Sequence, residues 1–223
     1  MNCPPRAVHH AAALTLMTVL LASCNAGPRN AGDGDIHGVA AAGSVGAHAH
    51  DNPIDAKPAP TGATAFSVYD LEARWHDQGG HPLILRDLAG RPRVIAMVYT
   101  SCAYACPRIL KDMKRIEGEL RTAGIDAGYV MVSIDPERDT PARLSEYARS
   151  VMLDPADWTL LAGTDDSVLE LAALLGVRYR RVGEADFEHS NIITLLDGSG
   201  RIVHRQIGLN AEPDALVRAA AVL

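Results

Sequence analysis

The chain has 223 residues, enough for one folded domain with appendages. Its 21 basic and 27 acidic residues give a net charge of −6. The sequence lacks the basic patch that nucleic-acid binding requires, which excludes a nucleic-acid-binding protein. A hydrophobic content of 48% supports a sizeable core, although an apolar N-terminal segment inflates that figure.

Residues 1–23 have the features of a cleaved signal peptide. Arg6 is the only charge, residues 11–21 are apolar, and the run is too short to span a membrane. The run ends at Leu21-Ala22-Ser23-Cys24, which resembles a bacterial lipobox. We therefore expect Cys24 to be the lipidated first residue of an extracytoplasmic, membrane-anchored protein, on the periplasmic side in a Gram-negative bacterium. The alternative for Cys24 is an ordinary thiol beside an ordinary secretory cleavage site.

Residues 24–63 are rich in Ala, Gly, Pro and Asp and have no apolar period, which predicts a flexible tether. The tether carries His37, His48 and His50. These histidines could be solvated linker residues, which is the commoner outcome, or they could capture metal loosely. The folded domain is expected at residues 64–223.

The first part of that domain alternates between strand-like and helix-like patterns. The continuous apolar run at 94–99 indicates a buried central strand, and apolar residues at helical spacing follow the turn after it. Thr140-Pro141 is typical of a helix start. The expected strands are 66–71, 83–85, 94–99, 128–134 and 158–161, with helices at about 107–122 and 141–153.

The second part adds a capped helix and a hairpin. The segment Asp197-Gly198-Ser199-Gly200 strongly predicts a hairpin turn between two apolar strands. The expected elements are a helix at 165–176, an edge strand at 177–179, strands at 191–196 and 201–206, and a helix at 213–222. Strand–helix–strand units imply parallel pairing. The order indicates an α/β, thioredoxin-like fold with a central mixed sheet flanked by helices.

Cys102 and Cys106 lie in the turn between the 94–99 strand and the helix that begins near Pro107. A helix N-terminus favours a thiolate over a thiol, so we expect Cys106 to be activated there. The spacing tolerates a disulfide or a bound metal, and two thiolates suit Cu(I) or Zn. The alternative is a pair of buried cysteines acting as small apolar residues.

His189 is the histidine most apt to join the cysteines. In a thioredoxin arrangement, the loop at 186–190 faces the cysteine turn. Two thiolates and one imidazole form a soft three-coordinate site that suits Cu(I) better than structural Zn. Met97, Met113 and Met131 fall on apolar positions and are expected in the core. No role is assigned to the remaining domain histidines, which are His76, His81 and His204.

Three segments together resemble the SCO/SenC family over roughly residues 66–209. They are Thr100-Ser-Cys-Ala-Tyr-Ala-Cys-Pro107, Val132-Ser-Ile-Asp-Pro-Glu-Arg-Asp-Thr-Pro141, and His189-Ser190 ahead of an apolar strand. Members are membrane-tethered, thioredoxin-like copper proteins that help to assemble the binuclear copper site of cytochrome c oxidase. The resemblance implies one copper ion, as Cu(I) and also as Cu(II), held by Cys102, Cys106 and His189.

The resemblance also implies partners: the copper-site subunit of the oxidase and a periplasmic copper donor or thiol reductant. Asp135 matches the family's Asp-Pro position, where an outer-shell or docking role competes equally with that of a strand-ending turn residue. Many relatives use a transmembrane helix where this chain has a lipobox.

The leading hypothesis is a copper metallochaperone. An enzymatic alternative is a thiol–disulfide oxidoreductase that reduces the acceptor's cysteines, with Cys102 and Cys106 as its redox pair. A redox or copper sensor is a third reading. A peroxidase is disfavoured because nothing marks a specialised peroxidatic cysteine.

Overall fold

The computed structural model describes residues 66–183 and 186–223. The predicted signal peptide, Cys24 and the tether with His37, His48 and His50 lie outside the described residues. Within the described ranges, no helix combines the length and hydrophobicity needed to cross a bilayer.

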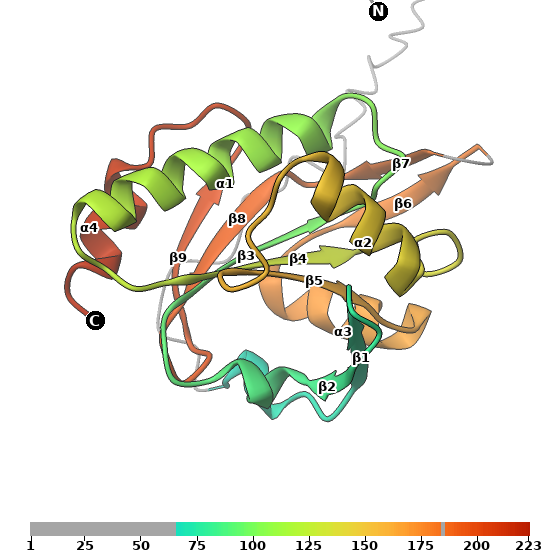
Figure 1. Ribbon diagram of the computed structural model, residues 1–223, viewed down its shortest axis with the longest axis horizontal. Helices are drawn as coiled ribbons and strands as arrows, with labels where there is room; N and C mark the ends of the chain where they lie inside the picture. Colours follow the sequence, from blue (N-terminus) through green and yellow to red (C-terminus); the bar gives the residue numbers. More distant parts are fainter. Residues whose placement is uncertain (1–65, 184–185) are drawn as a thin grey trace, which may run out of the picture. The chain divides into compact units, whose positions relative to one another are not determined.

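A mixed sheet of seven strands lies at the centre of the domain, in the order β2-β1-β5-β4-β3-β8-β9 (Figure 1). The β3, β4 and β5 strands pair in parallel, whereas β8 and β1 join them antiparallel. The strands are β1 (Arg74–Asp77), β2 (Pro82–Ile84), β3 (Arg93–Val98), β4 (Gly128–Ser133), β5 (Trp158–Ala162), β8 (Ile192–Leu196) and β9 (Ile202–Ile207).

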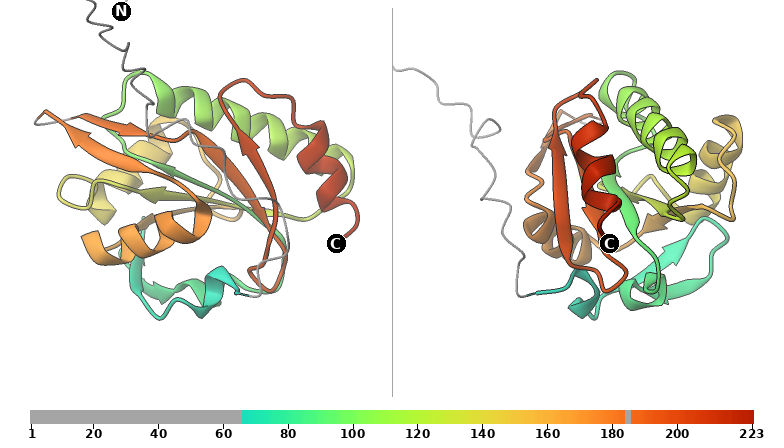
Figure 2. Two further views of the ribbon diagram at one scale, coloured as in Figure 1. Left: turned by 180° about the vertical axis from the view of Figure 1, so that it is seen from behind. Right: turned by 90° about the vertical axis from the view of Figure 1, so that its left-hand side faces the viewer.

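Four helices cover the sheet: α1 (Ala105–Thr122), α2 (Pro141–Ser150), α3 (Asp165–Leu175) and α4 (Asp214–Ala220). Figures 1 and 2 show α1, α2 and α4 on one face and α3 on the other. This follows from right-handed crossovers, because the chain moves outward from β3 to β5 through α1 and α2 and returns across the sheet through α3. With both faces covered, β3 and β4 can be almost wholly apolar.

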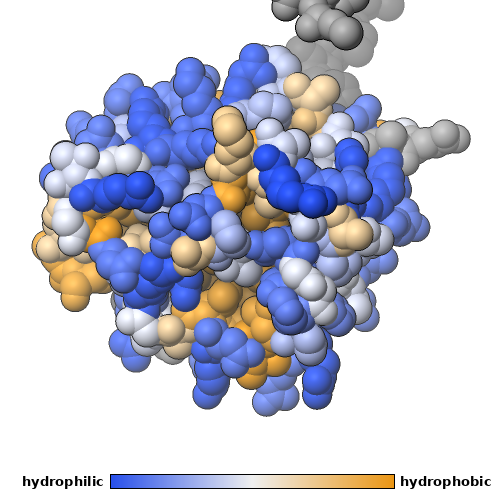
Figure 3. All heavy atoms as spheres, viewed as in Figure 1, coloured by the Kyte–Doolittle hydropathy of each residue, from blue (hydrophilic) through white to orange (hydrophobic). Residues whose placement is uncertain are grey.

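The core lies between the sheet and these helices. Trp75 and Trp158 are at most 1% exposed. Met97, Met113 and Met131 are equally buried, which confirms the prediction that they are core residues. On the face shown in Figure 3, hydrophilic side chains separate small apolar patches.

The expected strand at 66–71 is wrong. Val68–Asp70 is a 3-10 helix, η1, because the Ser67 hydroxyl accepts the Tyr69 N–H and the Asp70 carboxylate accepts the Ser67 N–H. These local side-chain bonds compete with strand pairing. A second 3-10 helix, η2 (Leu85–Leu88), follows β2.

The β1 strand was not predicted, because Trp75 is its only apolar residue. The β7 strand (Asp186–His189) was expected as a loop, because Phe187 is its only large apolar residue. The expected edge strand at 177–179 is displaced to β6 (Tyr179–Val182), which pairs antiparallel with β7 in a separate two-stranded sheet, the β6–β7 ribbon.

Candidate metal centre

Three potential ligands meet where β3 ends and α1 begins. Cys102 lies in the connecting loop, Cys106 in the first turn of α1, and His189 at the end of β7. One ligand atom from each lies within 4.8 Å of the others, and the Cys106 Sγ is 4.0 Å from the His189 Nε2. The structure therefore brings together the three residues that the sequence predicted as ligands.

The spacing of these atoms suits a single three-coordinate ion. Metal–sulfur bonds of about 2.3 Å and metal–nitrogen bonds of about 2.0 Å, arranged in a plane, separate the ligands by about 4 Å. Small side-chain adjustments within the 4.8 Å limit would reach that geometry. Two sulfurs and one imidazole form a soft donor set, which favours Cu(I).

His189 is prepared to act as a ligand through Nε2. Its side chain is 8% exposed, and its Nδ1 lies 3.2 Å from the Ser190 carbonyl oxygen. A carbonyl only accepts, so Nδ1 carries the proton and Nε2 offers its lone pair toward the sulfurs. Burial lowers the pKa of His189 below its ordinary value, outweighing the opposing bond to Ser190, and this favours the neutral imidazole.

The two cysteines differ in a way that the sequence did not predict. Cys106 is 1% exposed, and burial raises its pKa far above the ordinary value. The half-buried Cys102 has a lowered pKa: burial opposes ionisation, but the N–H groups of Cys106 and Tyr104 stabilise its thiolate. The Cys106 N–H lies 3.3 Å from the Cys102 Sγ.

The expectation of an activated Cys106 is therefore wrong. Because α1 begins at Ala105 rather than at Pro107, Cys106 lies inside the first turn and points into the core. The free N–H groups of that turn face Cys102 instead. The helix N-terminus thus activates the other thiol of the pair.

Tyr99, immediately after β3, contacts every component of the site. Its N–H lies 3.4 Å from the Cys106 Sγ, and its ring packs edge-on against those of Phe187 and His189. Burial, together with the interaction between its hydroxyl and Cys102, raises the pKa of Tyr99 to about 12. The sequence indicated no role for Tyr99 beyond that of the last residue of an apolar strand.

Asp139 stabilises the turn that carries Cys102, through hydrogen bonds with Thr100. It is 1% exposed and accepts hydrogen bonds from the Thr100 N–H (2.9 Å), the Thr100 hydroxyl (2.5 Å) and the Ser133 hydroxyl (2.6 Å). Thr100 precedes Cys102 by two residues, so Asp139 ties the turn to the end of β4. This role of Asp139 was not predicted from the sequence, although Asp139 lies in the 132–141 segment that carries the family resemblance.

Asp135 is not one of the residues whose ligand atoms converge. It is fully buried, and its carboxylate pairs with Arg138 at 2.5 Å and lies 3.9 Å from Arg181. A side chain at 0% exposure offers no contact to a docking partner in this structure. The outer-shell role stays a prediction.

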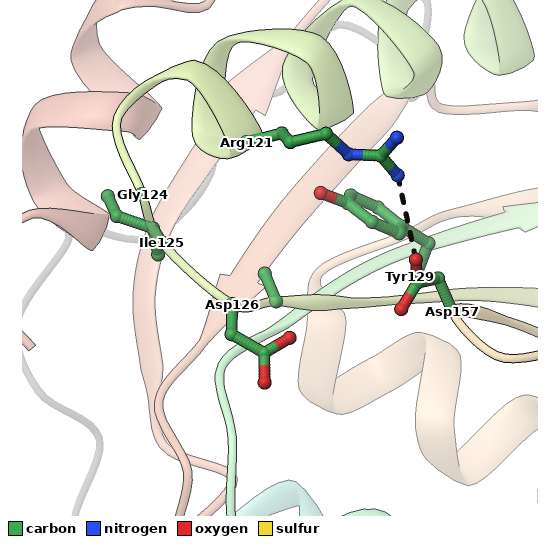
Figure 4. Close-up of a pocket in the computed structure, with 7 residues that line it drawn as sticks. Arg121, Gly124, Ile125, Asp126, Tyr129 and Asp157 are labelled. Carbon is green, nitrogen blue, oxygen red and sulfur yellow. Dashed lines mark ion pairs between the residues drawn. The ribbon is translucent and has the colours of Figure 1, made fainter.

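A cavity of about 270 Å³ lies elsewhere, beside the start of β4 (Figure 4). Arg121, Tyr129 and Asp157 line it, and Arg121 lies 3.6 Å from Asp157. It contains neither cysteine nor histidine and so offers no soft metal ligand. The thiol–imidazole cluster therefore remains the candidate site.

The chain is similar in sequence to known proteins. Residues 69–222 match the family model described as SCO1/SenC. The SCO1 protein homolog of Bacillus subtilis (strain 168) is 26% identical over 149 residues, covering 65% of this chain and 77% of that protein.

Two solved structures share the fold. Copper-bound ScoI from Bradyrhizobium japonicum is 28% identical, with a TM-score of 0.55 over 67% of this chain and 94% of that one. A SCO1/SenC family lipoprotein from Bacillus anthracis is 23% identical, with a TM-score of 0.63 over 70% of this chain and 95% of that one. These matches confirm the predicted thioredoxin-like fold.

Proposed function

The chain belongs to the SCO1/SenC family, and on that premise we propose that it is a copper metallochaperone that binds one copper ion through Cys102, Cys106 and His189. The convergence of these three donors within 4.8 Å is the observation that carries the proposal. The copper-bound relative supports the choice of metal. Copper is the cargo, and its destination is the binuclear copper site of cytochrome c oxidase.

The site has the properties that delivery requires. A three-coordinate ion can accept a fourth ligand from an acceptor before losing one of its own. Cys102 is the accessible ligand, since it is half-buried while Cys106 and His189 are at most 8% exposed. An acceptor thiolate would therefore approach beside Cys102, and Cys106 would hold the ion until transfer is complete.

The proposal includes a membrane anchor. A lipid on Cys24 and the tether that follows would hold the domain near its membrane-bound acceptor on the extracytoplasmic side. Mass spectrometry of the protein purified from a bacterial membrane tests this part. A diacylglycerol adduct on Cys24 is expected, and an unmodified Cys24 in a soluble fraction would contradict it.

Copper transfer tests the delivery step. Protein loaded with Cu(I) is mixed under anaerobic conditions with the reduced, copper-free copper-site domain of an oxidase subunit, and both proteins are separated and assayed for metal. Copper should move to the acceptor, and it should do so without a change in the thiol content of either protein. Copper that stays with the donor would contradict the proposed delivery.

One observation favours thiol–disulfide exchange as a second function: an accessible, low-pKa Cys102 stands beside the shielded thiol Cys106. The Cys102 thiolate would attack an acceptor disulfide and release one acceptor thiol. Cys106 would then lose its proton, attack Cys102, and release the second thiol. The acceptor gains two electrons, and the Cys102–Cys106 pair becomes a disulfide.

The two functions separate in the His189→Ala variant. Disulfide reduction needs only the two thiols and should survive this change, whereas copper transfer should not. Thiol counting and copper assay on the same reaction mixture distinguish them. Loss of both activities in a folded variant would contradict this division of roles.

A further inference from the structure

The β6–β7 ribbon carries His189 yet forms its own sheet, separate from the seven-stranded one. Figure 1 shows it beside the start of α1. At its base, the Ser190 N–H donates to the Arg178 carbonyl within the same segment. The chain ties His189 to β8, which begins three residues later, and side-chain contacts between the ribbon and the rest of the domain add to this tie in holding His189 over the thiols.

The first of these contacts is made by Tyr99. Its hydroxyl accepts the Phe187 N–H at 3.3 Å and lies 3.5 Å from the Phe187 carbonyl oxygen, to which it can donate. The two rings pack edge to face, with centroids 5.2 Å apart. Phe187 precedes His189 by two residues on β7, so this contact fixes the strand next to the ligand.

The second contact is made by Arg181 on β6, directly opposite Phe187 in the strand pairing. Its Nη2 lies 2.8 Å from the Glu137 carboxylate and 3.9 Å from that of Asp135, both in the segment after β4. Its guanidinium also lies over the Phe187 ring, 5.0 Å from the centroid. Arg181 therefore joins the ribbon to the domain through charge and through the ring.

The neighbouring Arg180 provides a contrast. It pairs with Glu188 at 2.5 Å, and both residues belong to the ribbon. This ion pair joins β6 to β7, and among the described residues Arg180 forms no ion pair with the rest of the domain. Two adjacent arginines thus form similar exposed ion pairs, of which only the Arg181 pair ties the ribbon to the segment that follows β4.

We propose that Tyr99 and Arg181 are positioning residues that hold the His189 imidazole over Cys102 and Cys106, and thereby set the rate at which the third ligand leaves a bound copper ion. The proposal rests on the proposed function, because it assigns these residues a role in copper retention. Weakening either contact lets the ribbon depart from the thiols more often. Copper held by two thiolates is then open to an incoming ligand.

The test compares Arg181→Met with the matched control Arg180→Met. Each protein is loaded with Cu(I), and transfer to excess bicinchoninate is followed by its absorbance. Exposed ion pairs contribute about 0.2–1 kcal/mol, so release from Arg181→Met should be faster by about 1.4- to fivefold. Release from Arg180→Met should match wild type. Equal rates in the two variants would overturn the proposal.

A double variant separates positioning from general destabilisation. If Arg181 acts through His189, adding Arg181→Met to a His189→Ala protein should leave the already fast copper release unchanged. If the acceleration seen in the single variant persists undiminished in that background, Arg181 acts elsewhere and the proposal is overturned.

A metal-free readout makes the proposal independent of copper binding. Amide hydrogen exchange of the Phe187 N–H, measured by NMR in the reduced apo protein, should quicken in Arg181→Met and in Tyr99→Phe but not in Arg180→Met. If wild type binds no copper tightly while this pattern holds, the ribbon contacts stand and the proposed function falls. Unchanged exchange in both Arg181→Met and Tyr99→Phe would overturn the positioning role.

Discussion

Replacing Asp139 by Ala should be one of the most destabilising single changes at the cysteine turn. The carboxylate accepts three hydrogen bonds, two from Thr100 and one from Ser133, in a setting where Asp139 is 1% exposed. Alanine leaves the buried Ser133 hydroxyl without this acceptor. Water cannot freely replace the lost bonds, because both Ser133 and Asp139 are almost fully buried.

The magnitude follows from these contacts. A hydrogen bond to a charged group contributes about 1.5–3 kcal/mol, and bonds that share one acceptor are not additive. We therefore expect Asp139→Ala to lower the free energy of unfolding by about 3–5 kcal/mol, out of a total of about 5–15 kcal/mol for a typical domain. Asp139→Asn keeps one acceptor oxygen and should cost less.

Urea unfolding of the reduced protein, followed by far-UV circular dichroism at neutral pH, measures this loss. Asp126→Ala is the control, since its side chain is 79% exposed and pairs with Arg91 at the surface, which predicts a loss below about 1 kcal/mol. A loss below about 1 kcal/mol in Asp139→Ala would refute the reasoning. The surviving folded variant should also bind copper more weakly, because Thr100 no longer fixes the turn.

Further predictions concern individual residues. Iodoacetamide should alkylate the reduced apo protein at Cys102 before Cys106, because Cys106 is 1% exposed with a raised pKa; peptide mass spectrometry showing the reverse order would contradict the assignment. Met97→Leu should keep the copper stoichiometry and lose less than about 1.5 kcal/mol of stability by urea unfolding, whereas loss of bound copper would identify Met97 as a ligand. Burial would raise the pKa of Asp197, but hydrogen bonds from Ser199 and Arg201 lower it below its ordinary value of 3.8. Its stabilising contribution should therefore be present above that pH and fade as the pH falls further, so the stability gap between wild type and Asp197→Ala should narrow in acid; a gap independent of pH would contradict this.

Long apolar patterns predicted the core of the fold. The run at 94–99 and that at 128–134 became β3 and β4, and the helix between them runs to Thr122 as expected. These elements bury their apolar residues, so the apolar pattern was sufficient to locate them. The short polar strands β1 and β7 were not predicted, because each carries one large apolar residue, Trp75 and Phe187 respectively. They form because they pair with neighbouring strands, β1 with β2 and β5, and β7 with β6.

The candidate site was also predicted only in part. Its ligands could be predicted because cysteine and histidine are common metal ligands. The residues that position these ligands could not be predicted, because in the sequence Tyr99 resembles an ordinary strand residue and Arg181 an ordinary surface charge. Their roles arise from contacts across 88 and 44 positions of sequence, with Phe187 and Glu137 respectively. The activation of Cys102 instead of Cys106 likewise depends on a helix start two residues earlier than expected.

The measurement that tests the three-ligand site most directly is an anaerobic Cu(I) titration of the reduced protein beside its His189→Ala variant, in competition with a chromophoric chelator. We expect one tightly bound copper in the wild type and a much weakened affinity in the variant, because only Cys102 and Cys106 remain there as ligands. Equal affinity in the two proteins would remove His189 from the site. Absence of tight copper in both would contradict the metallochaperone assignment and leave thiol–disulfide exchange as the function of the cysteine pair.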